Sequence, residues 1–323
     1  MKISSTSQNT GTGTHTRQLT APLPVPTKID ELRKFPTPMQ MNISLGKYHI
    51  TSIIAESKTN AVYHAIIKET EQHVAIKVLL GNLSLCDSLH YQSQQQLNIL
   101  SKLDHPNLNK VIDHGEVQGI PFYTTEYVAG YSLFHGISGQ PIEPLQAAEI
   151  TLEICNGVEH AHTHGILHTE INPDNIMLVP PYSAKVINFG LTGGSKLSIH
   201  PKAVHDGPTY HAPEYFSKND ALDERADIYS IGCTFLTMLT GFTPTPGNLD
   251  LNILSWCDPK FSEIINTCMQ EDREKRYPNC RVLADDISAL IAQISSTSAT
   301  GVQPPSPERA YVQMPSPGIS HPL

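Results

Sequence analysis

The order of the hydrophobic periods predicts an α+β fold in which a sheet comes first and helices follow. Between residues 48 and 128 the apolar residues form short runs that alternate with polar ones, which is typical of strands. After residue 128 they recur at helical spacing over longer stretches. Strands and helices segregated along the chain indicate separate layers rather than alternating β–α units. With 323 residues, the chain can hold two small domains or one larger two-lobed domain.

Strands rich in β-branched and aromatic residues are predicted at the start of the domain. They cover 48–54, 60–67 and 73–80, with a turn at 69–72, and two further strands follow at 110–112 and 121–128. Between them, Leu97, Leu100 and Leu103 have helical spacing within 85–103, and Asp104 and Pro106 end this predicted helix.

Amphipathic or fully apolar helices are predicted for the second half. They cover 145–164, 227–239, 261–269 and 281–294. The segment 227–239 is apolar nearly all round, which indicates a central core helix.

The two ends are predicted to be disordered because they contain few large apolar residues that could offset the entropy of ordering. They are 1–45 and the Ser/Pro-rich tail 295–323. The tail contains a near-repeat, VQPPSP at 302–307 and VQMPSP at 312–317. It is either a Pro-rich ligand for an SH3- or WW-like protein partner, a pair of phosphorylation sites at Ser306 and Ser316, or a solvated tail.

Composition excludes several classes of function. The formal net charge is −9 and there is no basic cluster, so nucleic acid is not an expected partner. No segment reaches the roughly 18 apolar residues of a membrane span, and the first residues lack the apolar run of a secretory signal. The six cysteines include no C-x-x-C pair, which favours free thiols and a cytoplasmic location.

Several motifs share the order and spacing of one known family. They are VAIK at 74–77, LDHPNL at 103–108, ILHTEINPDNIML at 166–178, NFG at 188–190, APE at 212–214, DIYSIG at 227–232 and EDREKRY at 271–277. On these motifs the stretch 48–294 resembles a Hanks-type Ser/Thr protein kinase domain. The resemblance implies a two-lobed fold, with a small antiparallel sheet lobe containing one helix at 48–127 and a larger helical lobe at 128–294.

The positions that shape the family's fold are kept. The resemblance implies a packed spine of Leu100, Val111, His168 and Phe189 anchored by Asp227, and an ion pair between Arg276 and Glu214. It implies an adenine slot lined by Val62, Ala75 and Met177, with Thr125 as gatekeeper and a hinge from Glu126 to Val128. These roles need packing and backbone hydrogen bonds, not catalysis.

The positions that carry the family's chemistry are changed. Ala55, Ser57 and Asn60 stand where the phosphate-binding loop has glycines, which allow the backbone to approach phosphates. In the catalytic loop Glu170 replaces the Asp base and Asn172 replaces a Lys. Thr169 replaces the Arg that contacts a phosphorylated activation segment, so Ser195, Ser198 and Thr209 lack that acceptor.

The charged partners of the nucleotide are also replaced. Lys77 is present, but its expected Glu partner is Gln96, which cannot neutralise an ammonium group. Asn188 replaces the Asp of D-F-G, and Asn175 adds only a second neutral oxygen. Because Mg²⁺ is usually held by carboxylates, this pair predicts weak or no Mg²⁺ binding.

A cluster of histidines ends the long predicted helix. His160, His162 and His164 precede His168. We interpret them as structural, since cations suit a helix C-terminus and no acidic or cysteine partner stands at ligand spacing.

The sequence therefore predicts a pseudokinase, a binding or scaffolding module that contacts protein partners through its lobe surfaces and Pro-rich tail. One alternative is a weak or atypical Ser/Thr kinase in which Glu170 is the base and Asn175 and Asn188 hold a metal. Another is a sensor that binds ATP without Mg²⁺ and transfers no phosphate.

Overall fold

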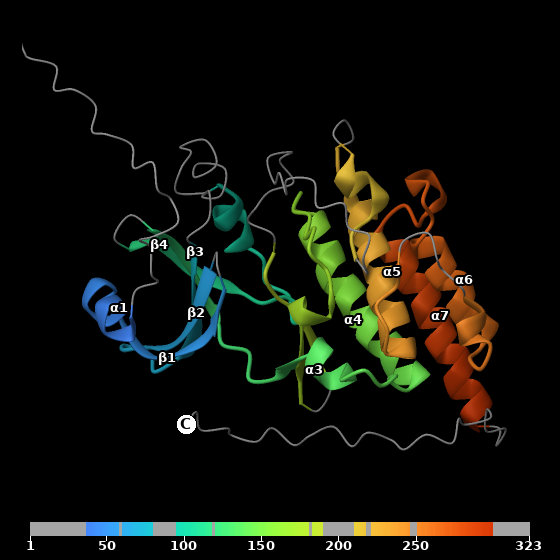
Figure 1. The fold of residues 1–323 in the computed structure, drawn as a ribbon, viewed down its shortest axis with the longest axis horizontal. Helices are drawn as coiled ribbons and strands as arrows, with labels where there is room; N and C mark the ends of the chain where they lie inside the picture. The colour runs from blue at the N-terminus through green and yellow to red at the C-terminus, as the bar shows by residue number, and fades with distance from the viewer. Residues whose placement is uncertain are drawn as a thin grey trace, which may run out of the picture. The chain divides into compact units, whose positions relative to one another are not determined.

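The computed structural model describes residues 37–57, 60–79, 95–117, 120–180, 183–189, 210–217, 221–245 and 251–299, which all belong to one compact unit, Phe35–Leu323. Figure 1 shows a β-sheet on one side of this unit and helices α4 to α7 on the other. The predicted α+β architecture, with an antiparallel sheet lobe followed by a helical lobe, is confirmed.

Five strands of the described chain form the antiparallel sheet of the first lobe, in the order β1-β2-β3-β5-β4. Their bounds are β1 Tyr48–Glu56, β2 Asn60–Ile67, β3 His73–Leu79, β4 Val111–Val117 and β5 Ile120–Glu126. In β3 the buried residues alternate with half-buried ones, so Val74, Ile76 and Val78 enter the small core while Ala75 and Lys77 point to the other face.

A helix that the sequence did not predict covers this small core. The stretch 1–45 was expected to be disordered, but α1 spans Pro38–Ser44. Met41 is fully buried in the same cluster as Tyr48 and Ile50. Asn42 accepts a hydrogen bond from the Ile50 amide at 2.7 Å and donates to the Ile50 carbonyl at 3.1 Å. Met41 in the core, Leu45 packed against it and the paired Asn42 amide hold this segment, and residues 1–36 lie outside the described ones.

Strand β4 is longer than predicted because its polar residues have partners. Asp113 accepts from the Tyr48 hydroxyl at 2.9 Å and lies 2.6 Å from the Lys47 ammonium. Its neighbours continue the register with β5 as far as Val117. Residues 95–100 are helical, with Leu97 and Leu100 buried, whereas the start of the predicted helix at 85–94 lies outside the described residues.

The second lobe is built around buried helices. Its helices are α3 Leu133–Ile137, α4 Pro144–His162, α5 Glu224–Thr240, α6 Pro259–Cys268 and α7 Cys280–Ala299. In α5 every residue from Ala226 to Leu239 is buried, which confirms the predicted core helix. Asp223 caps the start of α5, and Gly241 ends it with a left-handed φ of 77°.

A small sheet and a 3₁₀ helix of this lobe position the candidate catalytic site. Strands β6 Tyr131–Ser132, β7 Ile176–Val179 and β8 Ser183–Val186 form a small antiparallel sheet, and β7 follows the 3₁₀ helix Pro173–Asn175. Strands this short leave little periodic signal in the sequence.

Helix α7 continues five residues past the predicted end at 294. The tail was expected to be disordered from 295, but the helix ends at Ala299. The exposed Ser295 and Ser296 are tolerated here because α7 is already held by its buried face, including Leu283, Ile287 and Leu290. The Pro-rich near-repeat, with Ser306 and Ser316, lies outside the described residues.

The predicted ion pair between Arg276 and Glu214 is confirmed. The guanidinium donates from Nη1 to Oε1 at 2.6 Å and from Nη2 to Oε2 at 2.9 Å, and the Arg276 side chain is fully buried. This pair connects the 3₁₀ helix Pro213–Phe216 to the loop before α7. It fixes the segment that contacts Glu170, as described below.

Candidate nucleotide and catalytic site

The face of the first sheet opposite its small core carries the residues predicted for the adenine slot. Val62 in β2 pairs with Lys77 in β3, and Ala75 pairs with Thr125 in β5. The hinge begins where the Glu126 amide donates to the Lys110 carbonyl at 3.0 Å, and Val128 is half-buried just beyond it. Met177, also half-buried, lies in β7 opposite Lys185.

The predicted phosphate-loop positions form a closed turn instead of an open glycine loop. Ala55 pairs with Val62 at the end of β1. The Ser57 amide and hydroxyl both donate to the Asn60 carbonyl, at 2.8 and 3.2 Å, and the Asn60 amide donates back to the Ser57 hydroxyl at 3.1 Å. The two ends of the turn therefore bond to each other, and residues 58–59 between them lie outside the described ones.

The Asp227 carboxylate holds the backbone of the catalytic loop. It accepts hydrogen bonds from the His168 amide at 2.8 Å and from the Thr169 amide at 2.7 Å. Thr169 itself has a positive φ of 65°, which is uncommon for a residue other than glycine. Asp227 is buried, and its hydrogen bond with His162 lowers the pKa of the carboxyl although burial alone would raise it.

His168 connects this loop to the strand before the N-F-G triplet. Its Nε2 donates to the Ile187 carbonyl at 2.9 Å and its Nδ1 accepts from the Glu170 amide at 3.1 Å, which defines a neutral ring. Burial lowers the pKa of His168, in agreement with that state. The ring lies 4.7 Å from the Phe189 ring, centroid to centroid, as expected for the predicted spine.

A chain of amide side chains connects Lys77 to the catalytic loop. The Lys77 ammonium donates to Asn188 Oδ1 at 3.3 Å, and Asn188 Nδ2 donates to Asn175 Oδ1 at 3.0 Å. Asn175 Nδ2 in turn donates to the Glu170 carbonyl at 2.7 Å. Each side-chain oxygen expected to bind a metal therefore already accepts a hydrogen bond from within the protein.

Asn172 has a structural role. Its Oδ1 accepts from the amides of Asp174 and Asn175, at 2.9 and 3.2 Å, and so caps the 3₁₀ helix. Its Nδ2 donates to the Glu170 carbonyl at 3.0 Å. The side chain that replaces a catalytic lysine here shapes the loop.

The Glu170 carboxylate contacts two side chains from the segment around the 3₁₀ helix Pro213–Phe216. Its Oε1 accepts from the Tyr215 hydroxyl at 3.4 Å, and its Oε2 lies 3.3 Å from His211 Nε2. Burial and the nearby Glu170 charge raise the pKa of Tyr215 to about 12, so the phenol keeps the proton that it donates. Sequence reasoning missed this contact, since no pattern connects residues 45 positions apart.

The sequence profile of the protein kinase domain matches residues 48–298. The chain belongs to the protein kinase family. A probable serine/threonine-protein kinase of Streptomyces coelicolor is 27% identical over 281 residues, which cover 79% of this chain and 42% of that protein. The serine/threonine-protein kinase PknB of Mycolicibacterium smegmatis is 30% identical over 213 residues, or 62% of this chain and 34% of that protein. The chain thus spans less than half the length of these curated relatives.

Solved structures agree on the fold. The kinase domain of Mycobacterium tuberculosis PknI superposes with a TM-score of 0.64 at 22% identity, covering 75% of this chain and 96% of that one. Within this kinase fold, the described helices include none that is both long enough and apolar enough to cross a bilayer.

The described contacts of Lys77 in the kinase domain are with an amide and an aromatic ring, and it forms no ion pair with a described carboxylate. Besides Asn188, its ammonium lies 5.9 Å from the centre of the Tyr123 ring. Gln96 is half-buried in the helical stretch 95–100, and no described side chain there forms an ion pair with Lys77. The carboxylate that would neutralise this lysine is therefore not supplied by the part of the chain described here.

The kinase hinge has an ion pair that sequence reasoning missed. Lys185 in β8 lies 2.6 Å from Glu126 Oε1 and donates to the Leu108 carbonyl at 3.2 Å. Both side chains are mostly buried. The pair connects the last residue of β5 to β8 of the second lobe, at the residue that pairs with Met177.

A small pocket lies behind the kinase gatekeeper. Its lining includes spine and metal-position residues, and Asn109 Nδ2 donates to the Thr125 hydroxyl at 3.1 Å across it. The lining residues are Leu100, Asn109, Val111, Tyr123, Thr125, Asn188 and Phe189. The structure thus brings the predicted gatekeeper, spine and Asn188 together. The predicted sites Ser195, Ser198 and Thr209 lie outside the described residues.

Proposed function

We propose that this member of the protein kinase family is a pseudokinase, a binding or scaffolding module with little or no phosphotransfer. The observation that carries the proposal is the amide chain from Lys77 through Asn188 to Asn175. A kinase holds Mg²⁺ against the phosphates with the Asp of D-F-G and the Asn of the catalytic loop, so the carboxylate of this pair is the one that Asn188 replaces. This chain has two neutral amides whose oxygens are engaged in hydrogen bonds.

The residues present do not fit a magnesium–nucleotide complex. Mg²⁺ requires near-octahedral oxygen ligands and loses its waters reluctantly, and it is usually bound through one or two carboxylates plus phosphate. To bind it, Asn175 and Asn188 would have to give up their mutual hydrogen bond and the bond from Lys77. No catalytic step is therefore assigned through this metal.

The base position supports the same proposal. Glu170 keeps a carboxylate, but both of its oxygens face His211 and Tyr215. A general base must reach the hydroxyl that it deprotonates, and a displacement of about 1 Å can cost a hundredfold in rate. A substrate hydroxyl would compete with these two contacts.

A second candidate function is nucleotide binding without a metal. The Lys77 ammonium is hydrogen-bonded to a neutral amide, and no ion pair joins it to a described carboxylate. An anionic phosphate is the complementary ligand for such a cation. The adenine edge would meet the hinge backbone between Glu126 and Val128, beside Val62 and Ala75. Such a protein senses ATP and transfers no phosphate.

The names of the relatives favour a third candidate, a weak or atypical Ser/Thr kinase. The Streptomyces and Mycolicibacterium proteins are both named serine/threonine-protein kinases. In this case Glu170 is the base, and ATP turnover falls when Lys77 is replaced.

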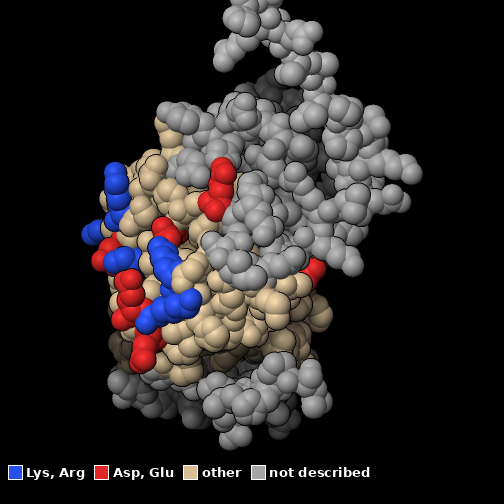
Figure 2. Space-filling model, turned by 90° about the vertical axis from the view of Figure 1, so that its left-hand side faces the viewer, with Lys and Arg blue, Asp and Glu red and all other residues tan. Residues whose placement is uncertain are grey.

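Partners are proposed to bind the lobe surfaces and the Pro-rich tail. Phe134, Phe216 and Phe242 expose about half or more of their surface, which suits protein contacts better than solvent. Figure 2 shows acidic and basic side chains intermingled on the face of the sheet lobe turned to the viewer. The free thiols of the described cysteines suit the cytoplasm, where we place the protein.

The deciding experiment measures the melting temperature of the full chain with ATP, with ATP and Mg²⁺, and with ATP and a chelator, together with phosphate transfer to a generic substrate. The pseudokinase proposal expects no Mg²⁺-dependent transfer above background. If ATP binds without metal, a hundredfold excess over its Kd adds about 2.7 kcal/mol of stability, and the shift persists in chelator.

The matched variants are Lys77→Met in the cleft and Lys68→Met on the surface, where the ammonium donates to the Gly46 carbonyl. Any ATP-induced shift should disappear in Lys77→Met and remain in Lys68→Met. Robust Mg²⁺-dependent transfer that is lost in Lys77→Met alone would establish the kinase alternative and overturn the proposal.

A further inference from the structure

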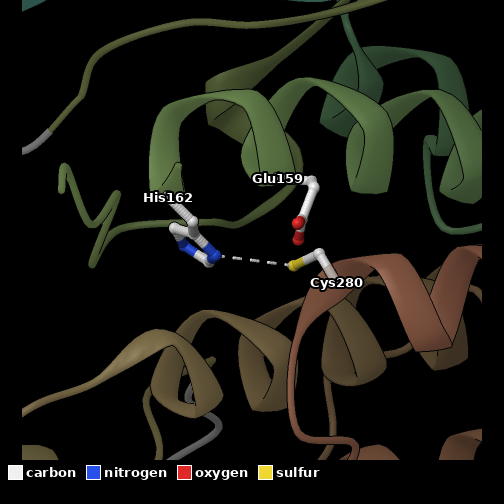
Figure 3. A group of neighbouring side chains, drawn as sticks. All are labelled: Glu159, His162 and Cys280. Atoms are coloured by element: carbon white, nitrogen blue, oxygen red, sulfur yellow. Dashed lines mark hydrogen bonds between the residues drawn. The ribbon is translucent and has the colours of Figure 1, made fainter. Parts of the chain in front are cut away.

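A group of three metal-ligating side chains lies outside the nucleotide site, where helix α7 begins against helix α4. Glu159 and His162 come from the last turns of α4, and Cys280 is the first residue of α7. Figure 3 shows the three side chains converging, with the His162 ring facing the Cys280 sulfur. Their ligand atoms all lie within 4.8 Å of one another.

The imidazole is oriented as a metal ligand. His162 Nε2 donates to Asp227 Oδ2 at 2.8 Å, which leaves the lone pair on Nδ1. That Nδ1 lies 3.8 Å from Cys280 Sγ. A carboxylate that holds the second ring nitrogen is the usual outer partner of a metal-binding histidine.

The donor spacing suits a tetrahedral ion. Zinc bonds of about 2.0–2.3 Å place neighbouring ligand atoms roughly 3.3–3.8 Å apart. The Nδ1–Sγ distance already falls at this value. Glu159 Oε2 accepts the Arg281 amide at 3.1 Å, and one carboxylate oxygen of Glu159 lies within 4.8 Å of the imidazole and thiol ligand atoms.

A further carboxylate lies near the imidazole. Glu224 Oε2, at the start of α5, is 4.0 Å from His162 Nδ1, and its side chain is 42% exposed. Glu224 is not among the three residues whose ligand atoms all lie within 4.8 Å of one another, so we expect a water molecule as the fourth ligand. His162 and Cys280 themselves are buried.

We propose that Glu159, His162 and Cys280 form a structural binding site for a zinc-class divalent cation. A thiolate and an imidazole select Zn²⁺ over Mg²⁺ or Ca²⁺, which prefer oxygen ligands. One thiolate and one carboxylate neutralise the two charges of the ion. Binding forms the metal–sulfur bond and breaks the S–H bond, and the thiol proton leaves to solvent.

The bound ion would tie three helices to the catalytic loop. It connects α4 to α7 directly, and through the His162–Asp227 hydrogen bond it reaches the carboxylate that holds the His168 and Thr169 amides. Without a cation, burial raises the pKa of the Cys280 thiol, so the sulfur keeps its proton and only the weak contact to Nδ1 remains.

The test uses Co²⁺ as a spectroscopic probe and Zn²⁺ as the ion, on the full chain after treatment with a chelator. One equivalent of Co²⁺ should give thiolate-to-metal charge-transfer absorption together with tetrahedral d–d bands. Zn²⁺ should displace it and raise the melting temperature. Cys280→Ser should abolish the charge-transfer band, and Glu159→Gln should weaken Zn²⁺ binding at least tenfold.

The matched control is Cys257→Ser, because that half-buried thiol lies near Glu143 and Asp258, away from the site. It should behave as the unmodified chain does. If Cys280→Ser does not fold, Glu159→Gln still tests the site. Because Glu159 is only half-buried, its replacement should leave the fold intact.

Two results would overturn the proposal. One is Co²⁺ binding without a sulfur band, as expected of a histidine pair such as half-buried His64 and exposed His73, whose ring nitrogens lie 2.9 Å apart. The other is Zn²⁺ affinity and stabilisation that are the same in the unmodified chain, Cys280→Ser and Glu159→Gln.

Discussion

Removing the Glu214 carboxylate should destabilise the second lobe strongly. In Glu214→Ala the fully buried Arg276 guanidinium loses both of its charge-assisted hydrogen bonds. Breaking a buried pair by removing one partner costs about 3–5 kcal/mol, because a desolvated charge is left behind. Arg276 still donates to the Gln270, Glu271 and Arg225 carbonyls, so the lower end, about 3 kcal/mol, is expected.

The assay is urea unfolding followed by circular dichroism, with thermal melting in parallel. A loss of about 3 kcal/mol corresponds to a fall of roughly 6–12 °C in Tm for a domain of this size. The matched control is Asp285→Ala, which breaks an ion pair with Arg281 whose side chains are 74% and 68% exposed. That change should cost less than about 0.5 kcal/mol. A loss below about 1 kcal/mol in Glu214→Ala would refute the reasoning.

Two further predictions concern packing and pH. Gly232→Ala should lower the unfolding free energy by about 1–3 kcal/mol, because the new Cβ would lie 2.5 Å from Cys268 Cβ where α5 meets α6. Gly46→Ala is the control, since no heavy atom lies within 4 Å of its Cβ, and it should change the unfolding free energy little. Equal effects of the two changes in urea unfolding would contradict this packing argument. Burial lowers the pKa of His168 below its ordinary value of 6.5, so the unfolded chain takes up this proton at higher pH than the folded one. The unfolding free energy should therefore fall as the pH drops from about 7 to 5, by at most about 1.4 kcal/mol per pH unit for this group. Urea titrations at several pH values measure this trend. A stability that rises toward pH 5 would exclude a neutral buried His168.

The fold was predictable because its elements follow local patterns. Alternation in 73–80 and the all-round apolar segment 227–239 led directly to β3 and to the buried helix α5. What failed were features without a helical apolar period. Met39, Met41, Ile43 and Leu45 alternate with other residues, which is the period of a strand, and the end of α7 is rich in Ser, so neither helix segment is visible to a periodicity argument.

The candidate site was predictable only where a motif fixes the position. Lys77, Asn175 and Asn188 follow from the motifs, and the structure brings them into one hydrogen-bonded chain. Pairs that depend on tertiary distance left no trace in the sequence. Glu170 meets Tyr215 across 45 positions, Lys185 meets Glu126 across 59, and Cys280 meets His162 across 118.

Helix α1 sets the working boundary of the folded protein. The family match begins at residue 48, so a fragment cut there would keep every recognisable motif. It would also uncover the sheet surface beneath Met41 and leave the Ile50 backbone without the Asn42 side chain. A truncated domain would therefore expose a hydrophobic patch on its smaller lobe. Its poor solubility would then look like a defect of the degenerate cleft.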